Sequence, residues 1–458
     1  MARPVNGKPA WLIERLKERP TDGVPEFVDT YLHMKYDADD IARIKAGYER
    51  KRTPVLWANP AVCTAEEAQS ALDEVGIACS PHAWCPGAFT VTQEELARFF
   101  ESELAAQGGI RVVDDPTALL VAELTAQAAN DLADARKAQA EAQAAADAEQ
   151  AAAANAQEAV ADGGNDVAAE HIATASAQVG TNDSKGAVMA VEQAPQVKQA
   201  TADDQGKRAV DELDASALGN AADSKQQTAM CAANVADAAT GNTFVAESGE
   251  SQDDVAEPFA PVSVAELCAG VGTMTLPLSA TTQDAVRIHA CEVSSAEYER
   301  LCAALETAGA TNVDAQRYDS RRFRSDEHAF DIILLDPPCT PTGTLYAHDP
   351  RLHAQFPEAK IPEYMALAKS LFLLSLSMLN VGGTLVYTTS SVLHLENEEV
   401  LRTCLARSGS MGTFEVEPVE LPGNVDLPQL PTSTEDAILT CPSETCPGRF
   451  IAKIRRIA

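Results

Sequence analysis

Basic and aromatic side chains are both scarce in this chain of 458 residues. It has 35 Lys and Arg against 68 Asp and Glu, a net charge of −33, a pI near 4.5 and an aromatic content of 5%. Proteins that bind nucleic acid take much of their affinity from basic side chains placed on phosphates. The composition therefore excludes a chain that binds nucleic acid over its whole surface. Any such contact must use a locally basic surface or a partner protein.

Long apolar runs and paired cysteine motifs are also missing. The most apolar helical stretch, residues 371–381, is interrupted by two serines and an asparagine, and no secretory signal stands out. We therefore expect no membrane association and an intracellular location, with mitochondrial and nuclear or nucleolar compartments both open. The eleven cysteines are scattered, and Cys441 and Cys446 have no second pair nearby, so we expect loop cysteines and no metal site.

Composition divides the chain into three regions. Residues 1–120 predict a small folded α+β domain, with amphipathic helices at 65–75 and 93–105. Residues 121–257 form an acidic insert rich in Ala and Gln. Residues 258–458 alternate short apolar runs with helical patterns, which predicts a second folded domain.

The acidic insert has two parts of different composition. Residues 125–257 hold 23 acidic and 7 basic side chains, about half of the charge imbalance. Alanine favours a helix over 121–160, but no stripe of large apolar residues obliges that helix to pack. Beyond residue 160, Gly, Asn, Asp and Ser predict disorder. The region is therefore expected to be a solvated low-complexity insert, suited more to protein partners than to RNA.

The third region has the pattern of a doubly wound parallel sheet, because buried-strand runs alternate with helices at 295–308 and 363–379. The expected parallel strands are Val262–Leu267, Arg287–Val293, Val313–Tyr318, Phe330–Leu335 and Thr384–Thr389. Two further runs, Phe414–Leu421 and Arg449–Ile454, predict a closing antiparallel hairpin. The predicted fold class is α/β, with the Rossmann-like sheet of the methyltransferases.

Polar residues and glycines follow the first strands of this predicted sheet. The first strand runs into Cys268-Ala269-Gly270-Val271-Gly272-Thr273-Met274, and glycines at such a turn let a cofactor approach the backbone. Glu292 and Asp319 end the next two strands, where carboxylates line the ligand crevice of such sheets. A tight structural turn and helix caps remain alternatives for each feature alone. Together they favour S-adenosylmethionine (SAM), and the missing third glycine disfavours a dinucleotide.

The fourth strand ends in a rigid loop, Asp336-Pro337-Pro338-Cys339. The two prolines fix φ and hold the backbone away from helix. A purely structural turn needs neither the aspartate nor the cysteine, so the loop predicts a surface that faces a flat base.

Two motifs together resemble a known family. The segment Leu335-Asp336-Pro337-Pro338-Cys339-Thr340-Pro341-Thr342-Gly343 and the segment Thr-Leu-Val-Tyr-Thr-Thr-Ser-Ser-Val-Leu-His-Leu-Glu-Asn-Glu-Glu at 384–399 resemble signature motifs of the Fmu/Nop/Sun family of RNA (cytosine-5) methyltransferases. In that family the second motif reads Tyr-Ser-Thr-Cys-Ser before Glu-Asn-Glu, and its cysteine attacks the base. The segments 52–60, 82–88 and 109–116 are similar to the family's N-terminal RNA-binding part.

The resemblance implies a role for each matched residue. It implies SAM as cofactor and RNA, of ribosomal type, as partner. Asp336 would lie between SAM and the target cytosine, Cys339 matches a second cysteine that helps release product, and Ser390 stands at the nucleophile position. The residues that would wrap the SAM methionine are Cys268, Ala269, Gly270, Val271, Gly272, Thr273 and Met274, with Glu292 on the ribose and Asp319 on the adenine.

Two departures from the family pattern decide between the functional alternatives. Met274 replaces a lysine expected near the SAM carboxylate, and Ser390 replaces the attacking cysteine. A serine hydroxyl titrates far above a thiol and needs a dedicated base, which the sequence does not reveal. The preferred interpretation is an RNA-binding methyltransferase-like protein with weak or no catalysis and a role in ribosome assembly. The alternatives are an active cytosine-5 methyltransferase that uses Cys339, and a SAM enzyme of another class.

Overall fold

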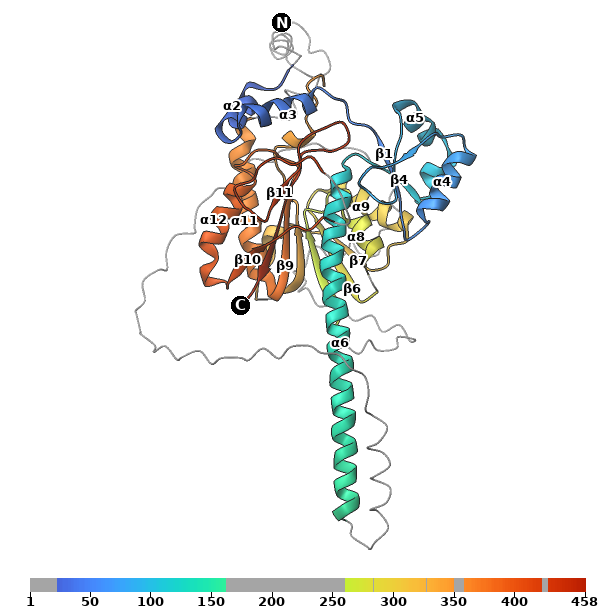
Figure 1. The fold of residues 1–458 in the computed structure, drawn as a ribbon, viewed down its shortest axis with the longest axis vertical. Coiled ribbons are helices and arrows are strands. Elements are labelled where there is room, and N and C mark those ends of the chain that lie inside the picture. The colour runs from blue at the N-terminus through green and yellow to red at the C-terminus, as the bar shows by residue number, and fades with distance from the viewer. Residues whose placement is uncertain (1–22, 162–259, 283, 327, 350–357, 422–426) are drawn as a thin grey trace, which may run out of the picture. The chain divides into compact units, whose positions relative to one another are not determined.

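The computed structural model describes residues 23–161, 260–282, 284–326, 328–349, 358–421 and 427–458 (Figure 1). The disorder predicted beyond residue 160 falls almost entirely outside these residues.

A large mixed sheet organises the second half of the chain. Its strands follow the order β10, β12, β9, β8, β5, β6 and β7, with β11 paired to β12. Neighbours among β5 to β9 pair in parallel, whereas β12 is antiparallel to β9 and to β10. This confirms the predicted Rossmann-like α/β fold of five parallel strands closed by an antiparallel hairpin. The strands are β5 Val262–Leu267, β6 Val286–Glu292, β7 Val313–Arg317, β8 Phe330–Leu335, β9 Leu379–Thr389, β10 Phe414–Glu417, β11 Ile438–Leu439 and β12 Phe450–Arg456.

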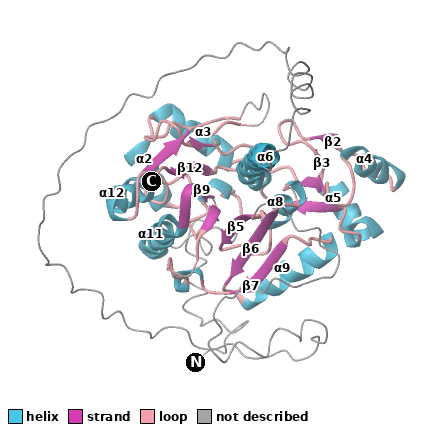
Figure 2. Cartoon of the chain, turned by 90° about the horizontal axis from the view of Figure 1, so that it is seen from below, coloured by secondary structure: helices cyan, strands magenta, loops and turns pink. Residues whose placement is uncertain are grey.

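Helices cover both faces of this sheet, because successive residues of a strand point to opposite sides. In β8, Ile333 and Leu335 join one hydrophobic cluster, and Ile332 and Leu334 join another. The first cluster includes α2, α3, α11 and α12, and the second includes α8 and the start of α6 (Pro116–Ala161). In Figure 2, α11 and α12 lie together beside β9. The helices are α2 Glu26–Lys35, α3 Ala38–Tyr48, α8 Thr275–Thr281, α9 Ser295–Ala308, α11 Ile361–Met378 and α12 Glu398–Arg407.

The N-terminal part contributes both to the large sheet and to a small sheet of its own. Helices α2 and α3 bury Leu32 and Ile44 in the same cluster as the large sheet. The small sheet has the order β2, β3, β1, β4 and a separate core around Leu56 and Phe89. Its elements are β1 Val55–Ala58, α4 Ala65–Glu74, β2 Ser80–Pro81, β3 Ala88–Thr90, α5 Gln93–Glu101 and β4 Ile110–Val113.

Helix α6 (Pro116–Ala161) corrects one expectation from the sequence. A helix was expected over this alanine-rich stretch, but none of it was expected to pack. Its first turns are buried in the cluster on the second face of the sheet, through Leu120, Ala126, Ala129 and Ala133. The apolar stripe was missed because it is made largely of alanines, whose small side chains let a helix approach a sheet closely. Residues 141–154 of this helix are uniformly exposed.

Candidate active site

The turn between β5 and α8 forms the predicted cofactor loop. Cys268, Gly270 and Gly272 all have positive φ, at 64°, 58° and 86°. A Cβ on Gly272 would lie 2.8 Å from Leu301 Cδ1, so this glycine lets the turn pack against α9. A Cβ on Gly270 would meet nothing within 4 Å, so its backbone faces open space. A non-glycine residue in the left-handed region is strained, and such strain concentrates at functional turns.

Glu292 ties the end of β6 to this turn. It is buried, with one oxygen accepting a hydrogen bond from the Gly270 amide at 2.9 Å and the other from the Ser294 amide at 2.6 Å. Each carboxylate oxygen can accept a second hydrogen bond, so the ribose hydroxyls of a nucleoside remain suitable donors. The structure therefore brings Glu292 and the predicted cofactor loop together.

Asp319 follows β7, as predicted, but its carboxylate is already engaged. It accepts two hydrogen bonds from the Arg321 guanidinium, at 2.9 and 2.7 Å, and a third from the Arg321 amide at 3.1 Å. These hydrogen bonds outweigh partial burial and hold the pKa of Asp319 below its usual value. Its predicted contact with adenine would compete with Arg321.

Glu266 is a buried acid of this turn that was not singled out from the sequence. It is 3% exposed, and its Oε2 has no hydrogen-bond partner among the described residues. Burial raises the pKa of Glu266 to about 8, against a smaller opposing effect of the Thr275 hydroxyl. Met274, where the family resemblance expects a lysine, is buried in the apolar cluster on the second face. The sequence signal for Glu266 was its position next to the end of a strand that leads into a glycine turn.

The loops after β8 and β9 bring together the three predicted reactive residues. Asp336 directly follows β8, and the Ser390 backbone amide acts to lower the pKa of the Cys339 thiol, against the larger effect of burial. The Gly343 amide donates to the Ser390 carbonyl at 2.8 Å, which fixes one loop on the other. All three side chains are partly exposed.

The Glu-Asn-Glu run after Ser390 supports its loop. The Asn397 side chain accepts from the Thr389 hydroxyl at 2.5 Å and donates to the Ser391 carbonyl at 2.8 Å, so it fixes both neighbours of Ser390. Glu396 is buried and accepts from the Thr340 amide and hydroxyl at 2.8 and 3.0 Å. These residues therefore position the two loops that carry Cys339 and Ser390.

Arg449 lies at the centre of the site, although no sequence motif pointed to it. Its side chain is 4% exposed, and the guanidinium donates to acceptors from three distant parts of the chain. These acceptors are Asp115 Oδ2 (2.6 and 3.2 Å), Thr117 Oγ1 (3.0 Å), Asp336 Oδ2 (3.3 Å), Thr388 Oγ1 (3.2 Å) and Ser390 Oγ (2.7 Å). The only sequence signal was an arginine at the edge of an apolar strand.

The charges around Arg449 set the ionisation of its neighbours. Burial alone would raise the pKa of Asp115, but Arg449 and Thr117 hold it below the usual value. Burial dominates at Asp336, whose pKa is raised despite Arg449. Burial, followed by the charges of Glu396 and Asp336, raises the pKa of Cys339 well above that of a free thiol. The Cys339 side chain is therefore a neutral thiol at neutral pH, whereas nucleophilic attack requires the thiolate.

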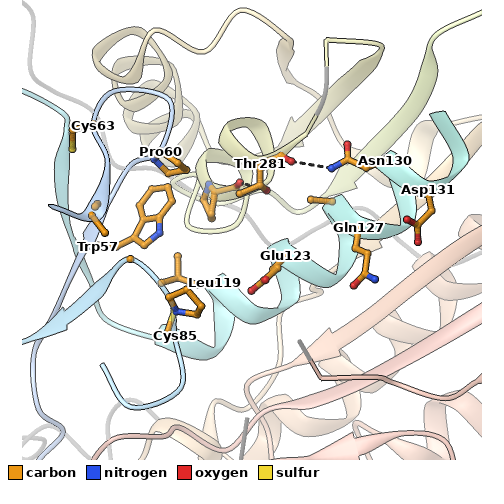
Figure 3. Close-up of a pocket in the computed structure, with 16 residues that line it drawn as sticks. Trp57, Pro60, Cys63, Cys85, Leu119, Glu123, Gln127, Asn130, Asp131 and Thr281 are labelled. Atoms are coloured by element: carbon orange, nitrogen blue, oxygen red, sulfur yellow. Dashed lines mark hydrogen bonds between the residues drawn. The ribbon is translucent and has the colours of Figure 1, made fainter. Parts of the chain in front are cut away.

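A separate pocket of about 590 Å³ lies between the small sheet, α6 and α8 (Figure 3). Trp57, Pro86 and Leu119 form apolar walls, and burial raises the pKa of Glu123 on one side. Asn130 donates to the Thr281 carbonyl at 3.0 Å across the junction of α6 and α8. None of the predicted site residues lines this pocket, so its volume does not mark the chemical centre.

The described residues hold neither a metal site nor a membrane-spanning helix. Within them, no group of three or more His, Cys, Asp and Glu side chains could hold a metal ion, and no helix is long and apolar enough to cross a membrane. The described cysteines, Cys441 and Cys446 among them, are all free thiols.

Comparisons with known proteins identify the second half of the chain. Residues 257–455 match the sequence model of the family described as 16S rRNA methyltransferase RsmB/F. The ribosomal RNA small subunit methyltransferase F of Aliivibrio fischeri is 30% identical over 151 residues, which cover 33% of this chain and 32% of that protein. The methyltransferase B of Escherichia coli is 32% identical over 168 residues, 36% of this chain and 38% of that protein. The chain thus spans about a third of the length of these curated relatives.

A solved structure shows the same fold. A methyltransferase homologue from Pyrococcus horikoshii has a TM-score of 0.52 and 16% identity, and the match covers 94% of this chain and 99% of that chain. The family match confirms the resemblance to the Fmu/Nop/Sun methyltransferases and implies SAM as the methyl donor, which suits the open backbone at Gly270 and the carboxylate of Glu292. Residues 257–455 are thus similar to the 16S rRNA methyltransferase RsmB/F family.

Proposed function

We propose that this protein binds SAM and structured ribosomal RNA, transfers methyl groups to cytosine carbon 5 weakly or not at all, and serves in ribosome assembly. One observation carries the proposal. The hydroxyl at the nucleophile position, Ser390 Oγ, accepts a 2.7 Å hydrogen bond from Arg449, and that guanidinium is held in turn by Asp115 and Asp336.

The chemistry of cytosine makes this arrangement unfavourable for methyl transfer. Carbon 5 is a poor nucleophile until a group adds covalently to carbon 6, and a thiolate serves this purpose well. A serine hydroxyl is ionised only at very high pH, and the hydrogen bond from Arg449 occupies a lone pair of Ser390 Oγ. Removal of a covalent nucleophile lowers rates by several orders of magnitude.

The turn after β5 and the end of β6 support the proposal that SAM binding is retained. The loop 268–274 and Glu292 would hold SAM, which supplies an electrophilic methyl group when bound. Gly270 keeps the backbone accessible, and Glu292 keeps lone pairs for the ribose. The family match supports ribosomal RNA as the partner class, and the net charge of −33 favours an additional protein partner in an assembly complex.

A second function, methylation through Cys339, is favoured by one specific observation. The Cys339 thiol is partly exposed and lies beside the Ser390 backbone amide, which favours its ionised form. Arg449 acts in the same direction, although burial outweighs both.

The test combines calorimetric titration of the full chain with SAM and a methyl-transfer assay on 16S rRNA transcripts. We expect a micromolar dissociation constant for SAM, about −8 kcal/mol, and salt-sensitive binding of the transcript. Methyl incorporation by the wild type should not exceed that of the Cys339→Ala variant, and Ser390→Ala should bind SAM as the wild type does.

Two outcomes would overturn the proposal. Robust methylation that Cys339→Ala abolishes and Ser390→Ala leaves intact would establish the second function. Absence of both SAM and RNA binding would show that the fold is used only as a protein platform.

A further inference from the structure

We propose that Arg449 is a positioning residue through which the N-terminal part of the chain controls the reactive loops. Asp115 and Thr117, at the start of α6, and Asp336 and Ser390, in the loops after β8 and β9, all bind the same guanidinium. The proposal concerns the site before any reaction, and it goes beyond the proposed function because it holds whether or not methyl transfer occurs.

The geometry of the guanidinium is what makes the coupling direct. Arginine presents five N–H donors in one rigid plane, so the acceptors around it cannot move independently. Nη2 donates both to Asp115 Oδ2 at 2.6 Å and to Ser390 Oγ at 2.7 Å. A shift of Asp115 must therefore displace the hydrogen bond at Ser390 or break its own.

A second arginine makes the N-terminal part hold the same loop from another side. Arg52, which precedes β1, donates to the carbonyls of Gly343 and Thr344 at 2.7 and 2.9 Å. The Gly343 amide in turn donates to the Ser390 carbonyl. Two basic residues thus connect segments before and after the small sheet to the loops that carry Cys339 and Ser390.

The charge balance gives this coupling a measurable chemical effect. Asp115 and Asp336 share one buried cation, and each forms an ion pair with it, at 2.6 and 3.3 Å. The charged groups that act on Cys339 are Glu396 and Asp336, which disfavour the thiolate, and Arg449, which favours it. A change at Asp115 therefore reaches the Cys339 thiol through Arg449, and the reactivity of that thiol reports on the coupling without any substrate.

The experiment measures alkylation of Cys339 by iodoacetamide in the full chain, from pH 6 to pH 10, by mass spectrometry of the Cys339 peptide. Arg449→Gln should slow alkylation about tenfold at a given pH, a shift of one unit in the profile. The control is Arg456→Gln, on the same strand, whose side chain donates to the Leu379 carbonyl outside the site. This control should leave the profile unchanged.

Coupling is tested by adding Asp115→Asn to each background. In the wild type this substitution should shift the Cys339 profile, because Arg449 becomes free to pair fully with Asp336. In Arg449→Lys, which keeps the charge but has no planar fork, the same substitution should have less than a third of that effect. The lysine variant keeps the test decisive if the glutamine variant does not fold.

Equal effects of Asp115→Asn in the wild type and in Arg449→Lys would overturn the proposal, because Asp115 would then act on the thiol only through space. An unchanged profile in folded Arg449→Gln would overturn it as well.

Discussion

Two buried carboxyl groups have opposite pKa shifts. One lies at the cofactor end of the site, the turn 268–274 with Glu292, and the other at the base end, the loops of Asp336, Cys339 and Ser390 around Arg449. Glu266, at the cofactor turn, forms no ion pair with any of the described residues, and burial raises its pKa to about 8. Asp115, at the base end, is buried to a similar degree, but its ion pair with Arg449 at 2.6 Å keeps its pKa below the usual value. The comparison shows that a neighbouring cation decides the ionisation of a buried acid in this site.

The difference also separates two ways of building the site. The cofactor end consists of backbone turns, the buried Glu266 and Asp319, which is paired with Arg321. The backbone at Gly270 stays open for a ligand that brings its own cationic group. The base end carries a cation of the protein, which is already saturated by Asp115, Asp336 and Ser390. A ligand can bind at the cofactor end without breaking existing contacts. At the base end, a ligand that binds Arg449 must replace one of its present acceptors.

The largest effect on the free energy of unfolding is expected when the charge of Asp115 is removed, which makes this position neutral like Glu266. Asp115→Asn leaves Arg449 buried with one carboxylate less, and loss of one partner of a buried pair costs about 3 kcal/mol of unfolding free energy. Because the pKa of Asp115 is lowered by folding, its contribution is present above the unfolded value near pH 4 and is lost in acid. Urea unfolding at pH 7 and pH 3 should therefore show a smaller difference between wild type and variant at pH 3. An equal difference at both pH values would contradict this account.

A smaller effect is expected at the glycine turn, which defines the cofactor end. Gly272→Ala forces a side chain to φ 86° and against Leu301, which should cost about 2 kcal/mol. The matched control, Gly270→Ala, has a φ of 58° and open space, and should cost about 1 kcal/mol. Calorimetric titration should nevertheless show the weaker SAM binding in Gly270→Ala, because its methyl group projects into the ligand space. Unchanged SAM affinity in that variant would place the cofactor elsewhere.

The effect of Glu266→Gln is smallest near pH 5, and it has the opposite pH dependence to that of Asp115. A carboxyl whose pKa is raised by folding binds its proton more tightly in the folded state, so its stability contribution is complete at low pH. It falls from about pH 4.5 to about pH 8, by at most about 1.4 kcal/mol per pH unit. The variant should lack this decline, and denaturant titrations from pH 5 to pH 8 measure it. If the unfolding free energies of wild type and variant changed with pH in parallel, the pKa of Glu266 would not be raised by folding.

The sequence predicted the elements of the large sheet well, because their signals are local. Val262–Leu267, Phe330–Leu335 and the helix over 295–308 agree with the structure residue by residue. The packing of α6 was missed, since a stripe of alanines has no strong hydrophobic signal. The cofactor loop and Glu292 could be predicted to meet because carboxyl ends of adjacent parallel strands share one edge.

The base end could be predicted only in part. Asp336 and Cys339 are close in sequence, and a motif placed Ser390 beside them. The contacts of Arg449 with Asp115 and Ser390 span 334 and 59 residues of chain. No periodicity or spacing rule relates such positions, because the fold alone brings them together.

The hydrogen bond between Ser390 and Arg449 also constrains how this chain can change by mutation. A cysteine at 390 would remove the hydroxyl that accepts from Nη2, while an apolar residue at 449 would leave Asp115 and Asp336 close together without a cation. The effect of a thiol at position 390 therefore depends on which residue stands at position 449.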